Sequence, residues 1–402
     1  MADTLFVLGR EPALSVAEIE ARLGGWQATP LAVHPEVALV RSSKNLPPGT
    51  VDRLGGTVKL ASVEECVTKT GDFLADVKRV CTAEWLQSQL PDGRGDFGVS
   101  VYGVSRAERQ AAQRHFFGLK KELTAAGRPV RLVTSREPQL SAVTVVRQGL
   151  LKRGREIVIY RGQQYTAIGA TIAVQDYRAY SLRDYGRPAA DPKSGMVPPK
   201  LAQMMLNIAQ VQPDDILLDP FCCSGTILQE ALLLGVRRLH GYDTNQRAVK
   251  NAQENIRWLF KEFPHLQGSV DIILQDARHP TIRPTVIVTE PDLGPALRGR
   301  ETPAFLSDQL RRLGRLYLES FQQWAKTLSA GCRVVMIWPE FSINGKPSRP
   351  NIAEAVASLG FEPIPLLSSE TARVLGVTDR FVLSYGRSDA RLRRQIRKWI
   401  KR

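Results

Sequence analysis

The chain has 402 residues, of which 43% are hydrophobic and 24% are charged, and it carries a formal net charge of +15. This length suits two or three domains, and this composition is typical of a globular protein rather than a disordered one. No apolar run reaches about 18 residues, and the N-terminus lacks a basic segment followed by an apolar one. We therefore expect no membrane span, no secretory signal and a cytoplasmic location. The excess of positive charge favours a polyanionic partner, with nucleic acid as the first candidate.

The five cysteines and five histidines are scattered along the chain. Their spacing matches neither a disulfide framework nor a set of metal ligands. We therefore expect reduced thiols and no bound metal.

The N-terminal part interleaves short strands with helices. Strands are expected at residues 4–8 and 37–40, and a helix with Ser15 as its N-cap lies between them. This alternation favours a small α+β layer of ferredoxin type over residues 1–60, with any other small α/β module as the alternative.

The next stretch, residues 61–150, is richer in strand signals. Strands are expected at residues 97–103, 127–133 and 140–146, with a helix around residues 118–123. This succession resembles a THUMP domain, the RNA-binding module of several tRNA-modifying enzymes. Residues 151–176 that follow are expected to be a linker.

Basic and aromatic side chains cluster in this stretch, as contacts to RNA phosphates and bases require. They are Arg106, Arg109, Arg114, His115, Phe116, Phe117, Lys120, Lys121, Arg128 and Arg131. A solvated helix face is the alternative, since Glu108 and Glu122 lie among the positive charges.

From residue 177 onward the pattern changes to that of an open α/β sheet. Residues 216–218 form a short apolar run suited to a buried strand, and apolar residues then recur at helical spacing from Ile227 until Gly235. Between strand and helix lies the loop Asp219-Pro220-Phe221-Cys222-Cys223-Ser224-Gly225-Thr226. Ligands of such sheets bind at the carboxyl ends of strands, next to helix N-termini, so this loop is the candidate binding site.

The loop resembles motif I of the S-adenosylmethionine-dependent amino methyltransferases, which reads Asp-Pro-Phe-Cys-Gly-Ser-Gly-Thr. The one departure is Cys223, where the family has glycine. Asp243 lies 24 residues after Asp219, close to the spacing of about 20 expected for an acid that binds ribose hydroxyls. The resemblance implies that Asp276 accepts from the adenine amino group. The cofactor-binding candidates are Pro199, Asp219, Pro220, Phe221, Cys222, Ser224, Gly225, Thr226, Asp243, Asp276 and Ala277.

A fourth strand, residues 285–289, ends in Glu290-Pro291-Asp292-Leu293, where the same family carries Asp/Asn-Pro-Pro-Tyr. The exocyclic amine of guanine is a poor nucleophile, so its N–H groups need acceptors that orient it. Glu290, Pro291 and Asp292 are the catalytic candidates, and helix caps are the alternative reading of the two acids. Because Leu293 replaces the aromatic residue, base stacking must come from elsewhere. Tyr185, Phe221 and Trp338 are the candidates.

The segments Arg183 to Pro188 and Gly195 to Ala202 also resemble those that precede motif I in THUMP-type tRNA guanosine N2-methyltransferases of the position-10 type. The resemblance implies an α/β fold, with a Rossmann-like seven-stranded methyltransferase domain at residues 177–402 behind a smaller α+β ferredoxin-like and THUMP module. Its last two strands, residues 361–367 and 380–385, would form a hairpin. The implied cofactor is S-adenosylmethionine, and the implied partners are tRNA and, as in some relatives, a small activating protein subunit.

Two other functions fit part of the pattern. A DNA or rRNA amino methyltransferase would share both motifs but should lack the 97–146 module. An RNA-binding scaffold with an inactive methyltransferase domain is suggested by Cys223, Asp292 and Leu293. The basic end of the chain, residues 386–402, is expected to grip phosphates or to be a disordered solubilising segment.

Overall fold

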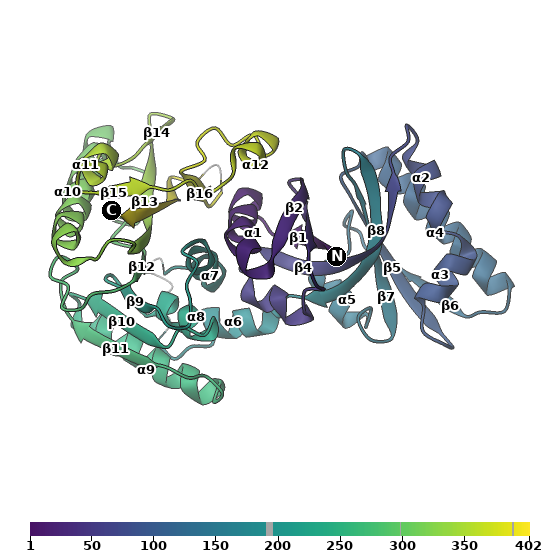
Figure 1. The fold of residues 1–402 in the computed structure, drawn as a ribbon, viewed down its shortest axis with the longest axis horizontal. Helices are drawn as coiled ribbons and strands as arrows, with labels where there is room; N and C mark the ends of the chain where they lie inside the picture. The colour runs from purple at the N-terminus through teal and green to yellow at the C-terminus, as the bar shows by residue number, and fades with distance from the viewer. Residues whose placement is uncertain (190–195, 298, 388–389) are drawn as a thin grey trace. The chain divides into compact units, whose positions relative to one another are not determined.

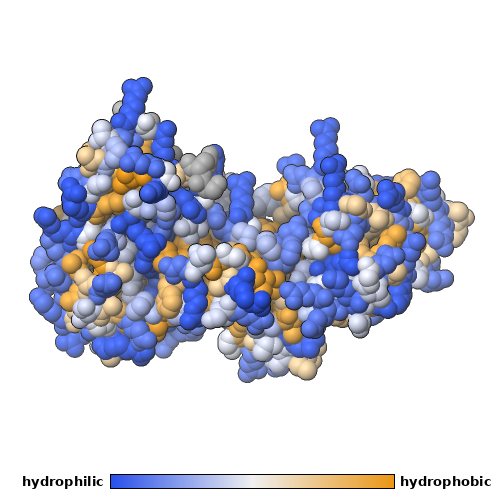
Figure 2. Space-filling view, turned by 90° about the horizontal axis from the view of Figure 1, so that it is seen from above, coloured by the Kyte–Doolittle hydropathy of each residue, from blue (hydrophilic) through white to orange (hydrophobic). Residues whose placement is uncertain are grey.

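The computed structural model describes residues 1–189, 196–297, 299–387 and 390–402 (Figure 1). The chain divides into two compact units. Unit 1 comprises residues 1–12, 23–53 and 57–177, and unit 2 comprises residues 13–22, 54–56 and 178–402. No helix in the described parts of the chain is long and apolar enough to span a bilayer. The face seen in Figure 2 is mostly hydrophilic, with small hydrophobic patches between the polar residues.

Unit 1 is built on one eight-stranded sheet with the strand order β2-β3-β1-β4-β8-β7-β5-β6. The strands are β1 (Ala2–Leu8), β2 (Ala28–Val33), β3 (Val37–Ser42), β4 (Thr57–Thr68), β5 (Gly95–Tyr102), β6 (Val130–Val133), β7 (Gly154–Arg161) and β8 (Tyr165–Val174). The helices in the first 150 residues are α1 (Pro12–Trp26), η1 (Pro48–Arg53), α2 (Phe73–Val80), α3 (Ala83–Gln89), α4 (Arg106–Ala125) and α5 (Ala142–Arg147). Residues 13–22 of α1 belong to unit 2. Helices α2, α3 and α4 close one core around Phe97, Phe116 and Leu123.

The sheet does not follow the domain boundaries expected from the sequence. Strand β4 runs across the boundary at residue 60, and the expected linker at 151–176 contains β7 and β8, two strands inside the sheet. The expected strand at 140–146 is wrong as well, because α5 occupies it. The hydroxyl of Ser141 accepts the Thr144 N–H at 3.1 Å, and this N-cap prevails over the strand preference of a Val- and Thr-rich run.

Unit 2 contains the α/β sheet that the sequence predicts. Seven strands lie on one continuous path, β11-β10-β9-β12-β13-β17-β15, with β14 beside β13 and β16 beside β17. The strands are β9 (Ile216–Asp219), β10 (Arg238–Asp243), β11 (Ser269–Leu274), β12 (Val286–Thr289), β13 (Arg333–Ile343), β14 (Lys346–Ser348), β15 (Phe361–Pro363), β16 (Leu383–Tyr385) and β17 (Leu392–Lys401). From β11 to β13 neighbouring strands run parallel, so the carboxyl ends of β9, β10 and β12 meet at one edge.

Helices lie on both faces of this sheet. The helices of this part of the chain are α6 (Tyr177–Tyr185), α7 (Pro199–Ile208), α8 (Thr226–Leu233), α9 (Gln246–Glu262), α10 (Pro303–Thr327), α11 (Ala353–Ser358) and α12 (Ser369–Val374). Alternate residues of β13, such as Met336 and Trp338, pack in the core beneath α10 and α11. Val335 and Ile337 are equally buried on the opposite face, where α7 contacts β13.

The basic end of the chain is not a tail. Residues 392–401 form β17, which inserts antiparallel between β13 and β15. Trp399 is 2% exposed and its ring lies 5.4 Å from that of Trp338 and 5.3 Å from that of Phe321. The expected hairpin between residues 361–367 and 380–385 is therefore wrong, since β15 and β16 each pair with β17 instead.

Candidate active site

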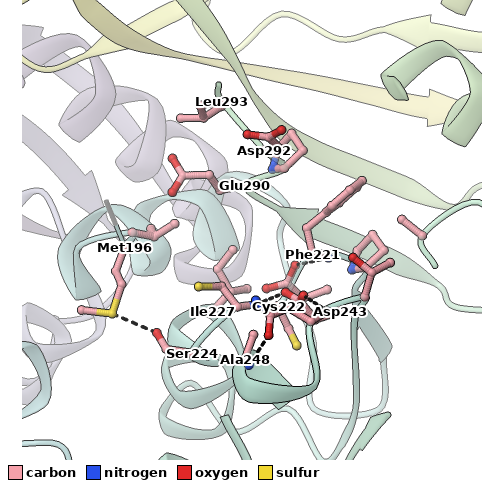
Figure 3. Close-up of a pocket in the computed structure, with 18 of the residues that line it drawn as sticks. Met196, Phe221, Cys222, Ser224, Ile227, Asp243, Ala248, Glu290, Asp292 and Leu293 are labelled. Atoms are coloured by element: carbon pink, nitrogen blue, oxygen red, sulfur yellow. Dashed lines mark hydrogen bonds between the residues drawn. The ribbon is translucent and has the colours of Figure 1, made fainter. Parts of the chain in front are cut away.

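A cavity of about 870 Å³ opens at the carboxyl ends of β9, β10 and β12 (Figure 3). This volume is within the range of small-molecule sites, about 300–1,000 Å³. In the close-up, Glu290, Asp292 and Leu293 lie in its upper part, while Asp243 and Ser224 lie below. Its charged lining groups are Asp219, Asp243, Asp276, Glu290, Asp292, Arg278 and Arg394. The excess of carboxylates over guanidinium groups favours a cationic ligand.

The loop between β9 and α8 has two residues with left-handed backbone conformation. Gly225 has a φ of 81° and Cys223 has a φ of 47°, a region that non-glycine residues rarely adopt. The glycine of the family motif is therefore replaced at a position whose backbone suits glycine. Gly225 is also the N-cap of α8 and supplies no side-chain cap, so the first amides of that helix are available to an anionic group of a ligand.

Asp243 ends β10 and fixes the shape of this loop. One carboxylate oxygen accepts the Cys223 N–H at 3.0 Å, and the other accepts the Asn245 N–H at 2.8 Å. Each oxygen retains a lone pair, and Asp243 lines the cavity. Its position fits the predicted ribose ligand.

Asp219 ends β9 and is almost fully buried, at 2% exposure. Its carboxylate accepts the Thr289 hydroxyl at 2.7 Å and the Phe221 N–H at 3.2 Å. Burial raises the pKa of Asp219 to about 7, because the charged form loses its hydration and lies near the carboxylates of Asp243 and Glu290. This acid therefore titrates near neutral pH.

The start of α8 is held by a segment before α7. The Ser224 hydroxyl donates to the Met196 sulfur at 3.1 Å, and the Thr226 hydroxyl accepts from the buried Arg187 guanidinium at 2.6 Å. Burial lowers the pKa of Arg187. Met196 lines the cavity, whereas Pro199 begins α7 and is buried outside it.

Asp276 and Ala277 follow β11 and line the cavity. Arg278 donates to both oxygens of Asp276, at 3.0 Å from Nε and 2.7 Å from Nη2, and lowers the pKa of this carboxyl. The Ala277 carbonyl accepts from the Trp324 indole at 2.9 Å. The role of Asp276 toward adenine stays a prediction, and Arg278 shares its place at the cavity wall.

Glu290 follows β12 and points into the cavity, with a side chain 10% exposed. Arg394 of β17 donates to its Oε1 from Nε at 2.5 Å, and its Nη2 lies 3.5 Å from Oε2. Burial raises the pKa of Glu290, whereas the Arg394 charge and hydrogen bond act in the opposite direction. The predicted orienting acid is thus present and has a partner of opposite charge.

Asp292 and Leu293 shape the rim. The Asp292 carboxylate accepts the Gly294 N–H at 2.8 Å and pairs with Arg312 of α10 at 2.8 Å, while its carbonyl accepts from the Tyr317 hydroxyl at 2.5 Å. Its charge is therefore turned toward α10.

Nearly all predicted site residues meet in this one cavity. Asp219, Pro220, Phe221, Cys222, Ser224, Thr226, Asp243, Asp276, Ala277, Glu290, Pro291 and Asp292 line it, while Pro199 and Gly225 do not. Of the stacking candidates Phe221 alone lines the wall. Trp338 is wrong for this role because it is fully buried beside Trp399, and Tyr185 is exposed on α6 and is not among the lining residues.

Comparison with known proteins supports this reading of unit 2. Residues 187–341 match the family model described as an RMKL-like methyltransferase domain. A tRNA (guanine(10)-N2)-dimethyltransferase of Methanothermobacter thermautotrophicus is 38% identical over 115 residues, 28% of this chain and 31% of that protein. Its namesake from Methanocaldococcus jannaschii is 36% identical over 98 residues, 24% of this chain and 25% of its own. The matched part therefore spans a third or less of these curated relatives.

Solved structures show the same fold at low identity. TrmN from Thermus thermophilus aligns over 100% of both chains with a TM-score of 0.58 and 16% identity. A predicted N6-adenine-specific DNA methylase from Listeria monocytogenes aligns over 100% of this chain and 97% of its own, with a TM-score of 0.51 and 12% identity. The match to the RMKL-like methyltransferase model covers residues 187–341, and the parallel strands and most of the cavity lining lie in the same part of the chain.

Proposed function

We propose that the chain is an S-adenosylmethionine-dependent methyltransferase that modifies the N2 amine of a guanosine in tRNA. The observation that carries this proposal is the meeting of two motifs in one cavity. The loop after β9, which resembles motif I, and the Glu290-Pro291 pair after β12 lie at the ends of adjacent strands. They are about 70 residues apart in the sequence. The matches to two tRNA (guanine(10)-N2)-dimethyltransferases support the choice of guanosine in tRNA.

The lining suits S-adenosylmethionine. The uncapped N-terminus of α8 would hold its carboxylate, the Asp243 carboxylate would accept from its ribose hydroxyls, and the acidic lining would favour its sulfonium charge. When bound, the cofactor supplies a methyl group whose carbon–sulfur bond is activated by the positive charge on sulfur.

The chain's own contribution is to orient the nitrogen and receive its proton. Glu290 would accept an N–H of the guanine amine, which leaves the nitrogen lone pair directed at the methyl carbon. As the new carbon–nitrogen bond forms, the nitrogen becomes acidic, and its proton passes to the carboxylate and then to water. Phe221 at the cavity wall would contact the flat face of the base.

The RNA-binding part of the proposal rests on the surface of unit 1. Phe117 on α4 is 48% exposed, with the Lys121 ammonium 4.9 Å from its ring centre. Arg128 donates to the Leu90 and Pro91 carbonyls and Arg131 pairs with Asp96, so these two serve the fold. The α4 surface around Phe117 is therefore our candidate RNA contact, and the THUMP assignment remains a prediction.

The test uses labelled S-adenosylmethionine with unmodified tRNA, followed by digestion to nucleosides. Labelled N2-methylguanosine supports the proposal, and its dimethylated form would show that transfer repeats. Labelled N6-methyladenosine would indicate a different amino methyltransferase. Cofactor binding by equilibrium dialysis, without labelled nucleoside from any tRNA, would favour an inactive RNA-binding scaffold. If the purified chain transfers no methyl group, the assay is repeated with cell extract added, and activity that appears only then would indicate a small activating subunit.

A further inference from the structure

The acid at the end of β12 meets a cation from a distant part of the chain. Arg394 lies on β17, where it is paired in register with Pro339 of β13 and Tyr385 of β16. Its Nε and Nη2 edge faces both oxygens of Glu290, at 2.5 and 3.5 Å, and both side chains line the cavity. The two side chains are 10% and 22% exposed, so the pair is largely shielded from water.

The other charged or titratable groups near Glu290 do not favour its anion. Asp219 at the end of β9 adds negative charge, and Tyr317 of α10 is buried close by. Asp292, two residues on, is already paired with Arg312. A carboxyl group in such surroundings would take up a proton unless a cation contacts it. A protonated Glu290 would be a donor at one oxygen and would face the N–H groups of guanine with the wrong polarity.

We propose that Arg394 is a positioning residue for methyl transfer, which holds the Glu290 carboxylate ionised and aimed at the amine of the target guanine. This inference rests on the proposed function. A carboxylate has about four lone-pair sites, and Arg394 uses one on each oxygen. One site on each oxygen is left for the substrate. Arg394 acts through Glu290 and need not touch the base.

The same strand supplies a matched control. Arg393 is the preceding residue and pairs with Glu340 of β13 at 3.4 Å, with side chains 32% and 10% exposed. Neighbouring residues of a strand point to opposite faces, and Arg393 does not line the cavity. Arg393→Ala therefore removes a comparable ion pair from β17 and leaves the site intact.

The experiment measures single-turnover methyl transfer to tRNA against pH for Arg394→Ala, Arg394→Lys, Glu290→Gln, Arg394→Ala/Glu290→Gln and the Arg393→Ala control. We expect Arg394→Ala to lower the rate by about 10²-fold at neutral pH, as misplaced groups do, with cofactor and tRNA affinity changed less than about threefold. Arg394 lowers the pKa of Glu290, so its loss should move the acidic limb of the profile to higher pH. Arg394→Lys should leave the acidic limb of the pH–rate profile near its original pH, and its rate should fall less than that of Arg394→Ala. In Glu290→Gln the limb should vanish, and adding Arg394→Ala should then have little further effect.

Two results would overturn the inference. One is an equal loss of rate at every pH in Arg394→Ala, with the limb unmoved. The other is a fully additive loss in the double variant, since independent sites add and coupled ones do not. If Arg394→Ala fails to fold, Arg394→Lys decides, because a shifted limb in a variant that keeps the charge contradicts the proposal. A wild-type chain that methylates no guanosine would refute the proposed function instead.

Discussion

Replacing Cys223 by glycine should relax the cofactor loop. This residue has a φ of 47°, and its N–H is held by the Asp243 carboxylate at 3.0 Å. The loop cannot leave the left-handed region without losing that hydrogen bond, so the strain stays in the folded state. Cys223→Gly keeps the bond and removes the side chain that lines the cavity.

The expected gain in stability is small and its sign is defined. A left-handed backbone conformation destabilises a residue with a side chain by about 1–2 kcal/mol. Glycine lowers the free energy of unfolding by about 0.4–1 kcal/mol, because it increases the entropy of the unfolded chain. The midpoints of the two ranges leave a stabilisation of about 0.8 kcal/mol. For the cofactor, we expect a tighter dissociation constant because the backbone can approach the ligand without an intervening Cβ and sulfur.

Urea unfolding of unit 2 and equilibrium dialysis of S-adenosylmethionine measure the two effects. Cys223→Ala is the control, since it removes the sulfur but keeps the Cβ and the strain. Cys223→Gly should have a higher free energy of unfolding and a higher affinity for S-adenosylmethionine than Cys223→Ala. A glycine variant destabilised by more than about 1 kcal/mol, or one that binds cofactor less tightly than alanine, would refute the reasoning.

The other predictions concern three side chains. Asp243→Ala should weaken cofactor binding and leave tRNA affinity within about twofold, and equal losses in dialysis and in tRNA filter binding would mean that this acid is structural. Trp399→Ala should lower the free energy of unfolding of unit 2 by about 3–5 kcal/mol, because a buried ring between Trp338 and Phe321 is lost; a urea midpoint within error of wild type would contradict this. The pKa of Asp219 is raised to about 7 from 3.8, so its contribution to stability is present below about pH 4 and is lost as the pH rises through 7. Asp219→Asn should flatten this fall in urea titrations between pH 4 and pH 7, and an unchanged slope would show that the carboxyl is not the group that titrates.

The parts of the site that the sequence predicts are those in which a short motif determines both local structure and chemistry. Asp219 and Glu290 each come at the end of a buried apolar run, Asp243 ends the strand between two motif positions, and the ends of neighbouring parallel strands must meet. Arg278 and Arg394 could not be found in this way. Their contacts depend on tertiary packing, and basic residues are common enough on surfaces that neither stands out.

Strand β17 escaped prediction for a related reason. Five of its ten residues are Arg or Lys, which reads as a solvated segment, although Ile396 and Trp399 are buried. Its long basic side chains are accommodated because they reach partners, as Arg394 reaches Glu290 and Arg393 reaches Glu340. An aromatic residue among positive charges could have suggested a buried strand.

The position of β17 also bears on the order in which the sheet is completed during synthesis. Synthesis proceeds at about 5–20 residues per second, and all the other strands of this sheet leave the ribosome before β17. Until β17 emerges, β13 has an unpaired edge that could join a foreign strand, and Glu290 lacks its cation. The nascent chain would therefore carry the loop after β9 before Glu290 gained its partner, and a chain that stopped before β17 would expose the edge of β13 and be prone to aggregate.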